Sequence, residues 1–229
     1  MPLYDRKDDD MRRISLTRIA ALTLSIAMLL TACSAPGAGG DSKGSDPAAN
    51  SGETTYKTEL NVAINANPPS MDPHGINSST VGGIGMHIYE PLFSLNANYE
   101  PVPVLAEGYT VSDDGLVYTI TLRQGVKFHN GQEMTADDVV ASMNLWLERC
   151  SKAQLIAGST FAKVDDYTVT LTVPQASSDI IMVLAAPIQF AAIYPQSVAE
   201  AAGPDGISEY IGTGPYELAE WKQDQYVKL

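Results

Sequence analysis

The sequence predicts a mixed α/β fold, and three stretches carry this prediction. Residues 116–122 and 167–173 alternate between apolar and polar side chains and are rich in β-branched residues, which is typical of half-buried strands. Residues 135–150 instead repeat apolar side chains at helical spacing. Thr135 is a suitable N-cap, and two aspartates follow in the first turn, where the helix dipole favours carboxylates. We therefore expect sheet and helix within one folded region.

Composition and charge narrow the class of protein. The chain has 229 residues, of which 45% are hydrophobic and 18% charged, as in an ordinary globular protein of one or two domains. Beyond residue 32, 9 lysine and arginine residues face 23 aspartate and glutamate residues, which gives a net charge of −14. A surface this acidic argues against nucleic acid as a partner and against electrostatic docking on anionic lipid.

The amino-terminal residues have the pattern of an export signal. Arg12, Arg13 and Arg18 precede an apolar run at residues 19–30, which is too short for a comfortable membrane span. The sequence Leu-Thr-Ala-Cys at residues 30–33 resembles a bacterial lipobox, in which Cys33 becomes the lipidated first residue of the mature protein. We expect a signal peptide at residues 1–32 and a flexible tether at residues 33–55. An ordinary signal peptide with an incidental cysteine is the alternative.

The remaining segments are assigned from the same periodicities and from glycine and proline breakers. Strands are predicted at residues 60–64, 126–128, 216–221 and 225–229. Helices are predicted at residues 82–89, 179–186 and 197–202, and a loop at residues 151–159. Trp146 and Cys150 fall on the apolar face of the helix at 135–150 and are expected in the core.

Residues 114–140 contain a long run of fixed spacings: Asp-Gly-Leu-x-Tyr-x-Ile-x-Leu-Arg-x-Gly-Val-Lys-Phe-His-Asn-Gly-x-x-Met-Thr-Ala-Asp-Asp-Val-Val. This run resembles the signature region of the family 5 solute-binding proteins, which are the peptide- and nickel-binding receptors of ABC importers. Shorter elements resemble the same family in the same order: Met-Asp-Pro-His at 71–74, Tyr-Glu-Pro-Leu at 89–92, Leu-Ala-Glu at 105–107 and Gly-Thr-Gly-Pro-Tyr at 212–216.

The resemblance implies a periplasmic-binding-protein-like fold of the peptide-binding type, with two lobes around a cleft. This chain would contain only the first lobe and its inserted subdomain. On this plan, residues 56–93 and 174–229 form the incomplete first-lobe subdomain, and residues 94–173 form the inserted one. The implied function is capture of an extracytoplasmic solute, above all an oligopeptide, by a monomer that closes over it and delivers it to an ABC permease.

Candidate ligand-binding residues come from the resemblance and from the expectation that loops at strand ends line the cleft. They lie in two segments and are Ser70, His74, Gly75, Ile76, Asn77, Gly212, Thr213, Gly214 and Tyr216. A purely structural crossover turn is the alternative for residues 212–216. The three histidines, His74, His87 and His129, fit no local metal pattern, so no metal or other cofactor is predicted.

Two other classes of protein compete with the receptor. An exported, lipid-anchored hydrolase would need a nucleophile with its base, or a metal cluster, in the folded part, and the sequence indicates neither. A sensor lipoprotein could keep the same fold without taking part in transport. We therefore predict no enzyme and no catalytic residue.

Overall fold

The computed structural model describes residues 57–229. The predicted signal peptide at 1–32, Cys33 and the tether at 33–55 lie outside the described residues, so these three predictions stay predictions. Residues 59–229 form one unit. Within residues 57–229, the longest helices fall short of the length and apolar character that crossing a membrane requires.

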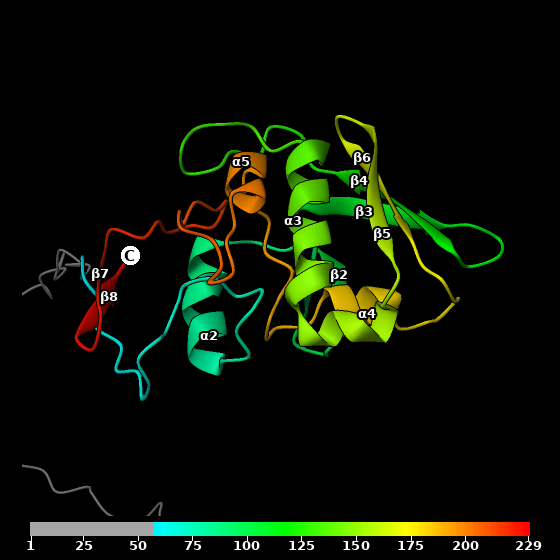
Figure 1. The fold of residues 1–229 in the computed structure, drawn as a ribbon. Helices are drawn as coiled ribbons and strands as arrows, with labels where there is room; N and C mark the ends of the chain where they lie inside the picture. The colour runs from blue at the N-terminus through cyan, green and yellow to red at the C-terminus, as the bar shows by residue number, and fades with distance from the viewer. Residues whose placement is uncertain (1–56) are drawn as a thin grey trace, which may run out of the picture. The chain divides into compact units, whose positions relative to one another are not determined.

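A four-stranded antiparallel sheet lies at the centre of the predicted inserted subdomain (Figure 1). Its strand order is β3-β4-β6-β5, with β3 at Ala106–Val111, β4 at Val117–Leu122, β5 at Thr160–Asp165 and β6 at Thr168–Thr172. On the central pair, Ile120 lies opposite Val169, and both side chains are fully buried. The predicted alternation of residues 116–122 is confirmed, because Tyr118, Ile120 and Leu122 all face the core.

Helix α3 (Ala136–Arg149) packs against this sheet and starts where the sequence predicts. The Asp138 carboxylate accepts a hydrogen bond from the Thr135 backbone N–H at 2.8 Å, which completes the expected cap. Trp146 is fully buried, and its Nε1 donates to the Gln189 carbonyl oxygen at 2.8 Å. Cys150 is buried at the end of the helix, so the predicted apolar face is confirmed.

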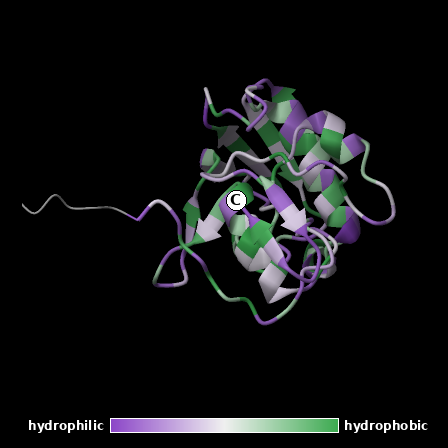
Figure 2. Ribbon diagram, turned by 90° about the vertical axis from the view of Figure 1, so that its left-hand side faces the viewer, coloured by the Kyte–Doolittle hydropathy of each residue, from purple (hydrophilic) through white to green (hydrophobic). Residues whose placement is uncertain are grey.

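Three α-helices and four strands lie outside the sheet and α3 in the described part of the chain. Helix α2 begins after the N-cap Ser78, whose hydroxyl accepts from the Val81 N–H. The elements are α2 (Ser79–Ile88), the pair β1 (Phe93–Leu95) and β2 (Pro101–Pro103), α4 (Ile180–Leu184), α5 (Gln196–Glu200), and the hairpin of β7 (Glu220–Lys222) and β8 (Tyr226–Lys228). Hydrophobic and hydrophilic residues alternate along the helices and strands (Figure 2), as expected when one face of each packs in the core.

Three local predictions are wrong, and a fourth is wrong in part, because the strand predicted at residues 216–221 begins only at Glu220. Residues 60–64 form no strand, and Leu60 and Val62 are 84% and 72% exposed, because no described strand pairs with them. Residues 126–128 form only an isolated bridge, Lys127 with Glu133, since the tight turn leaves no room for a ladder. The expected loop after α3 contains a 3₁₀-helix, η1 (Ser151–Ile156), whose Ala153 and Ile156 are three residues apart and both buried.

Candidate functional site

The predicted ligand loop at residues 69–77 is anchored through the buried side chain of Asp72, which is 1% exposed. Its Oδ1 accepts from the Tyr194 hydroxyl at 2.8 Å, and its Oδ2 accepts from the Ile207 N–H at 3.2 Å. Oδ1 also accepts from the His74 N–H at 3.0 Å, and the Arg149 guanidinium lies 3.7 Å from Oδ2. Asp72 therefore connects the loop to three segments that are distant in sequence.

His74 is fully buried beside this carboxylate. Its Nε2 lies 2.9 Å from the Ala192 carbonyl oxygen, so Nε2 carries the proton and donates it. Its ring lies 4.6 Å, centre to centre, from the ring of Tyr194. Burial lowers the pKa of His74 to about 4, against the opposing effect of the nearby Asp72. His74 is therefore a neutral packing residue in this structure.

The other residues predicted in this loop differ in exposure. Gly75 and Asn77 are exposed, Ile76 is half-buried, and Ser70 is 8% exposed. The geometry gives His74 a role in packing, whereas a ligand role for the loop residues stays a prediction. Asp72 and His74 thus fix the buried centre of the loop, and residues 75–77, which follow them, are more exposed.

Lowering the pH is expected to destabilise the lobe through His74. Because its pKa is lowered from 6.5 to about 4, the unfolded chain binds more protons between these values. The free energy of unfolding should fall by on the order of 2 to 3 kcal/mol as the pH drops from 7 to 4. Urea unfolding at several pH values measures this fall.

The His74→Gln variant should lose this part of the pH dependence, because its side chain does not titrate. The matched control is His87→Gln, whose ring is exposed on α2 and which should keep the parent profile. Equal pH profiles for His74→Gln and the parent chain would contradict a neutral, buried His74.

The Gly-Thr-Gly-Pro-Tyr turn packs against the carboxyl end of α2. The Gly214 N–H donates to the Ile88 carbonyl oxygen at 2.9 Å, and the Tyr216 N–H donates to that of His87 at 3.1 Å. These bonds satisfy carbonyl groups that the end of a helix leaves without partners. A Cβ on Gly212 would collide with the Ile88 carbonyl oxygen, and one on Gly214 would lie 2.5 Å from the His87 carbonyl oxygen. Close backbone contact therefore explains both glycines.

His129, from the loop before α3, holds the same turn from the other side. Its Nε2 donates to the Gly214 carbonyl oxygen at 2.9 Å, and its Nδ1 accepts from the Gly212 N–H at 3.3 Å. The Thr213 hydroxyl donates to Glu90 Oε2 at 2.9 Å. Three separate motifs of the sequence thus meet at the end of α2. This contact supports the structural alternative for residues 212–216, while a ligand role for Gly212, Thr213, Gly214 and the 55% exposed Tyr216 stays a prediction.

Adding one methyl group to this turn should destabilise the fold. Gly214→Ala is expected to lower the free energy of unfolding by about 1 to 3 kcal/mol, because the new Cβ collides with backbone atoms that cannot easily move. Gly83→Ala is the matched control, since Gly83 is exposed within α2 and nothing lies within 4 Å of its added Cβ. It should be neutral or stabilising by up to about 1 kcal/mol. Equal losses in urea unfolding would contradict the close-contact explanation.

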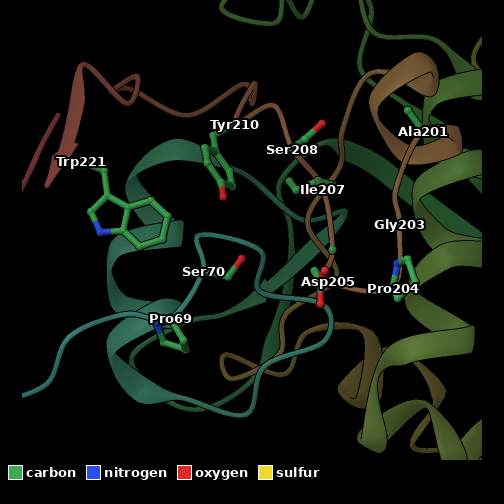
Figure 3. A pocket seen from close by; sticks show the side chains of 11 residues that line it. Pro69, Ser70, Ala201, Gly203, Pro204, Asp205, Ile207, Ser208, Tyr210 and Trp221 are labelled. Atoms are coloured by element: carbon green, nitrogen blue, oxygen red, sulfur yellow. The ribbon is translucent and has the colours of Figure 1, made fainter. Parts of the chain in front are cut away.

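A pocket of about 470 Å³ lies beside Asp72, between the loop at residues 69–70 and the carboxyl-terminal segment (Figure 3). Ser70 lines it from the loop, and Asp205 and Ser208 line it from the segment after α5. Tyr210, from the segment before residues 212–216, and Trp221, which lies on β7, add an aromatic wall, with ring centres 6.2 Å apart and planes at 74°. The pocket is large enough for part of a small solute.

Of the predicted site residues, only Ser70 lines this pocket. Sequence reasoning missed Asp205, Ser208, Tyr210 and Trp221. The Gly203-Pro204 pair is visible in the sequence, but only as the end of a helix, and no local spacing connects residues 203–221 with residues 69–70. The aromatic residues Tyr210 and Trp221 are the one feature of the sequence that could have indicated a binding pocket here. Aromatic residues are equally common in strands, so they do not indicate a pocket by themselves.

Residues 57–229 contain no cluster of three or more histidine, cysteine, aspartate or glutamate side chains that could hold a metal ion. The three histidines have separate surroundings. His74 is buried beside Asp72, His87 packs edge-on to Tyr216, and His129 binds the turn at 212–216.

Comparison with known proteins assigns a family. Residues 100–229 match the model of the bacterial extracellular solute-binding proteins, family 5, middle region. The glutathione-binding protein GsiB of Salmonella typhimurium is 40% identical over 174 residues, which cover 73% of this chain and 33% of that protein. GsiB of Escherichia coli O157:H7 is 36% identical over 174 residues, with the same coverage. The chain thus spans about a third of the length of these relatives.

Solved structures show the same fold. A dipeptide-binding protein from Pseudoalteromonas sp. SM9913, in complex with Met-Leu, is 25% identical with a TM-score of 0.63, over 71% of this chain and 37% of that one. The binding protein AgaA of A. tumefaciens R10, in complex with agropinic acid, is 29% identical with a TM-score of 0.60, over 68% and 32%. The fold is therefore part of that of the peptide-binding periplasmic binding proteins, and the chain belongs to the family 5 extracellular solute-binding proteins.

Proposed function

We propose that this chain contributes the first lobe of a receptor that captures an oligopeptide outside the cytoplasm and delivers it to the permease of an ABC importer. Family membership supports the receptor role, because the family consists of solute-binding proteins rather than enzymes. The match over residues 100–229 carries the proposal, since it includes the α3 cap, the sheet and the turn at 212–216. The chain covers about a third of its relatives, so the activity of a whole receptor is part of the proposal.

The choice of an oligopeptide is supported by what relatives bind. One relative is named for glutathione and another was solved with Met-Leu, while a third was solved with agropinic acid. Backbone groups at loop and strand edges can hold an extended peptide while tolerating varied side chains. The exposed Gly75 and Asn77 of the ligand loop would offer such groups.

Attachment to the membrane through Cys33 belongs to the same proposal. The lipobox-like sequence at residues 30–33 and the polar stretch after it fit a lipid-anchored protein with its folded part held away from the membrane. The acidic chain would not be held at an anionic surface by charge. We propose that the receptor works as a monomer, with the lipid as its membrane contact.

Uptake of a labelled oligopeptide by the source cells tests this function. Deletion of the gene should reduce uptake at least about tenfold, because the permease would lose its source of captured solute. The parent gene should restore uptake. The Cys33→Ser variant should lose incorporation of a labelled fatty acid, while the neighbouring Ser34→Ala variant should keep it.

Unchanged uptake after deletion would contradict the receptor role. If uptake persists while a transcriptional response to the peptide disappears, the sensor alternative is correct. If purified protein hydrolyses the peptide, the enzyme alternative is correct.

A further inference from the structure

Residues 59–64 have the side-chain pattern of a strand but no pairing partner in the described part of the chain. Leu60, Val62 and Ile64 are every second residue, so an extended backbone places these three apolar side chains on one face. The segment has neither a turn nor a bend. Among the described residues, no backbone hydrogen bond joins it to another segment. Its backbone groups and its apolar face are therefore both open to a partner.

The exposed face of this segment is apolar and uncharged. Leu60 is 84% exposed, Val62 is 72% exposed and Ile64 is 49% exposed. Single apolar residues at a surface are ordinary, but three in a row beside unpaired backbone groups are typical of a strand that pairs with another segment. Residues 60–71 contain no charged side chain, although the chain as a whole has a net charge of −13. The segment is therefore suited to a neutral, apolar strand.

The neighbouring hairpin of β7 and β8 also lacks a further strand. It lies beside the same part of the chain (Figure 1), because the Asp224 N–H donates to Asn67 Oδ1 at 3.2 Å, and Pro69 and Trp221 line one pocket. Each of its strands has only three paired residues. A two-stranded hairpin is marginally stable without additional strands or packing. The hairpin and residues 59–64 thus lie together, and both lack the neighbours of a complete sheet.

From these observations we infer that residues 59–64 pair with an extended segment from the rest of the receptor. That segment belongs to the part of a family 5 receptor that this chain does not match, since the match covers 33% of GsiB. Its backbone groups would form a ladder with residues 59–64, and its alternate side chains would cover the apolar face. A second copy of this chain fits less well, because two acidic chains repel each other. The inference rests on the proposed receptor function.

Hydrogen–deuterium exchange of the full chain, followed by mass spectrometry, tests this pairing. In the chain alone, the amides of residues 60–64 should exchange about as fast as those of an unstructured peptide. The paired strand β4, with its buried Ile120, should be protected and serves as the internal reference. The probe is the larger unmatched part of GsiB of Salmonella typhimurium. Its addition should slow exchange at residues 60–64 at least about tenfold.

The Val62→Glu variant should weaken binding of this probe at least about tenfold, because pairing would bury an unpaired carboxylate. It should leave the urea unfolding curve of the chain alone unchanged, since Val62 has little contact with the rest of the lobe. Val164→Glu is the matched control. Val164 is 59% exposed and lies on the edge strand β5, so the same substitution there should leave probe binding unchanged.

Three results would overturn the inference: no binding of the probe, binding without protection of residues 60–64, or parent affinity in Val62→Glu. A dimer of the chain alone in sedimentation velocity, lost in Val62→Glu, would also overturn it by assigning the segment to a second copy.

These outcomes are independent of the uptake measurement. Loss of uptake on gene deletion together with no probe binding would keep the receptor and reject the strand pairing. Normal uptake together with probe binding and protection of residues 60–64 would reject the transport role and keep the strand pairing.

Discussion

A buried carboxylate, that of Asp72, organises the amino-terminal part of this lobe. It receives hydrogen bonds from Tyr194 and from the backbone of Ile207, and it lies near Arg149 at the end of α3. A buried carboxylate without partners would cost several kcal/mol, so each of these contacts constrains where its own segment can lie. The loop at 69–77, the segment after α5 and the end of α3 are thereby brought to one place. The candidate pocket forms at their junction.

A second contact connects the sequence motifs to each other. His129 binds both Gly212 and Gly214, and the turn between them completes the carboxyl end of α2. The glycines permit a backbone approach that any Cβ would prevent. The residues that identify the family are therefore largely explained by folding of the lobe.

Much of the fold could be predicted because its signals are local. The cap at Thr135, the apolar face of α3 and the alternation in β4 depend on residues close in sequence. The strand predicted at residues 60–64 does not form, because a strand depends on pairing with a neighbour that can be distant in sequence. None of the described strands pairs with these residues. Likewise, η1 depends on burial of Ala153 and Ile156, which the loop-like composition of residues 151–159 does not indicate.

The candidate site was largely hidden from sequence reasoning. Ser70 was found because it belongs to a loop that follows a predicted strand, whereas Asp205, Tyr210 and Trp221 reach it only through the tertiary fold. His74 belongs to a recognisable motif, and for that reason the sequence suggests contact with a ligand, which stays a prediction. Its complete burial against Tyr194 and Ala192 gives it a role in packing that the motif does not indicate.

The most direct measurement of the role of Asp72 is a double-mutant cycle with Tyr194, read from the free energy of unfolding in urea. Asp72→Ala and Tyr194→Phe remove the two partners of a buried hydrogen bond of 2.8 Å. Since residues in one buried network are coupled, the cycle should give an interaction energy of about 1 kcal/mol or more. Strictly additive effects of the two substitutions would contradict the account in which this carboxylate holds the lobe together.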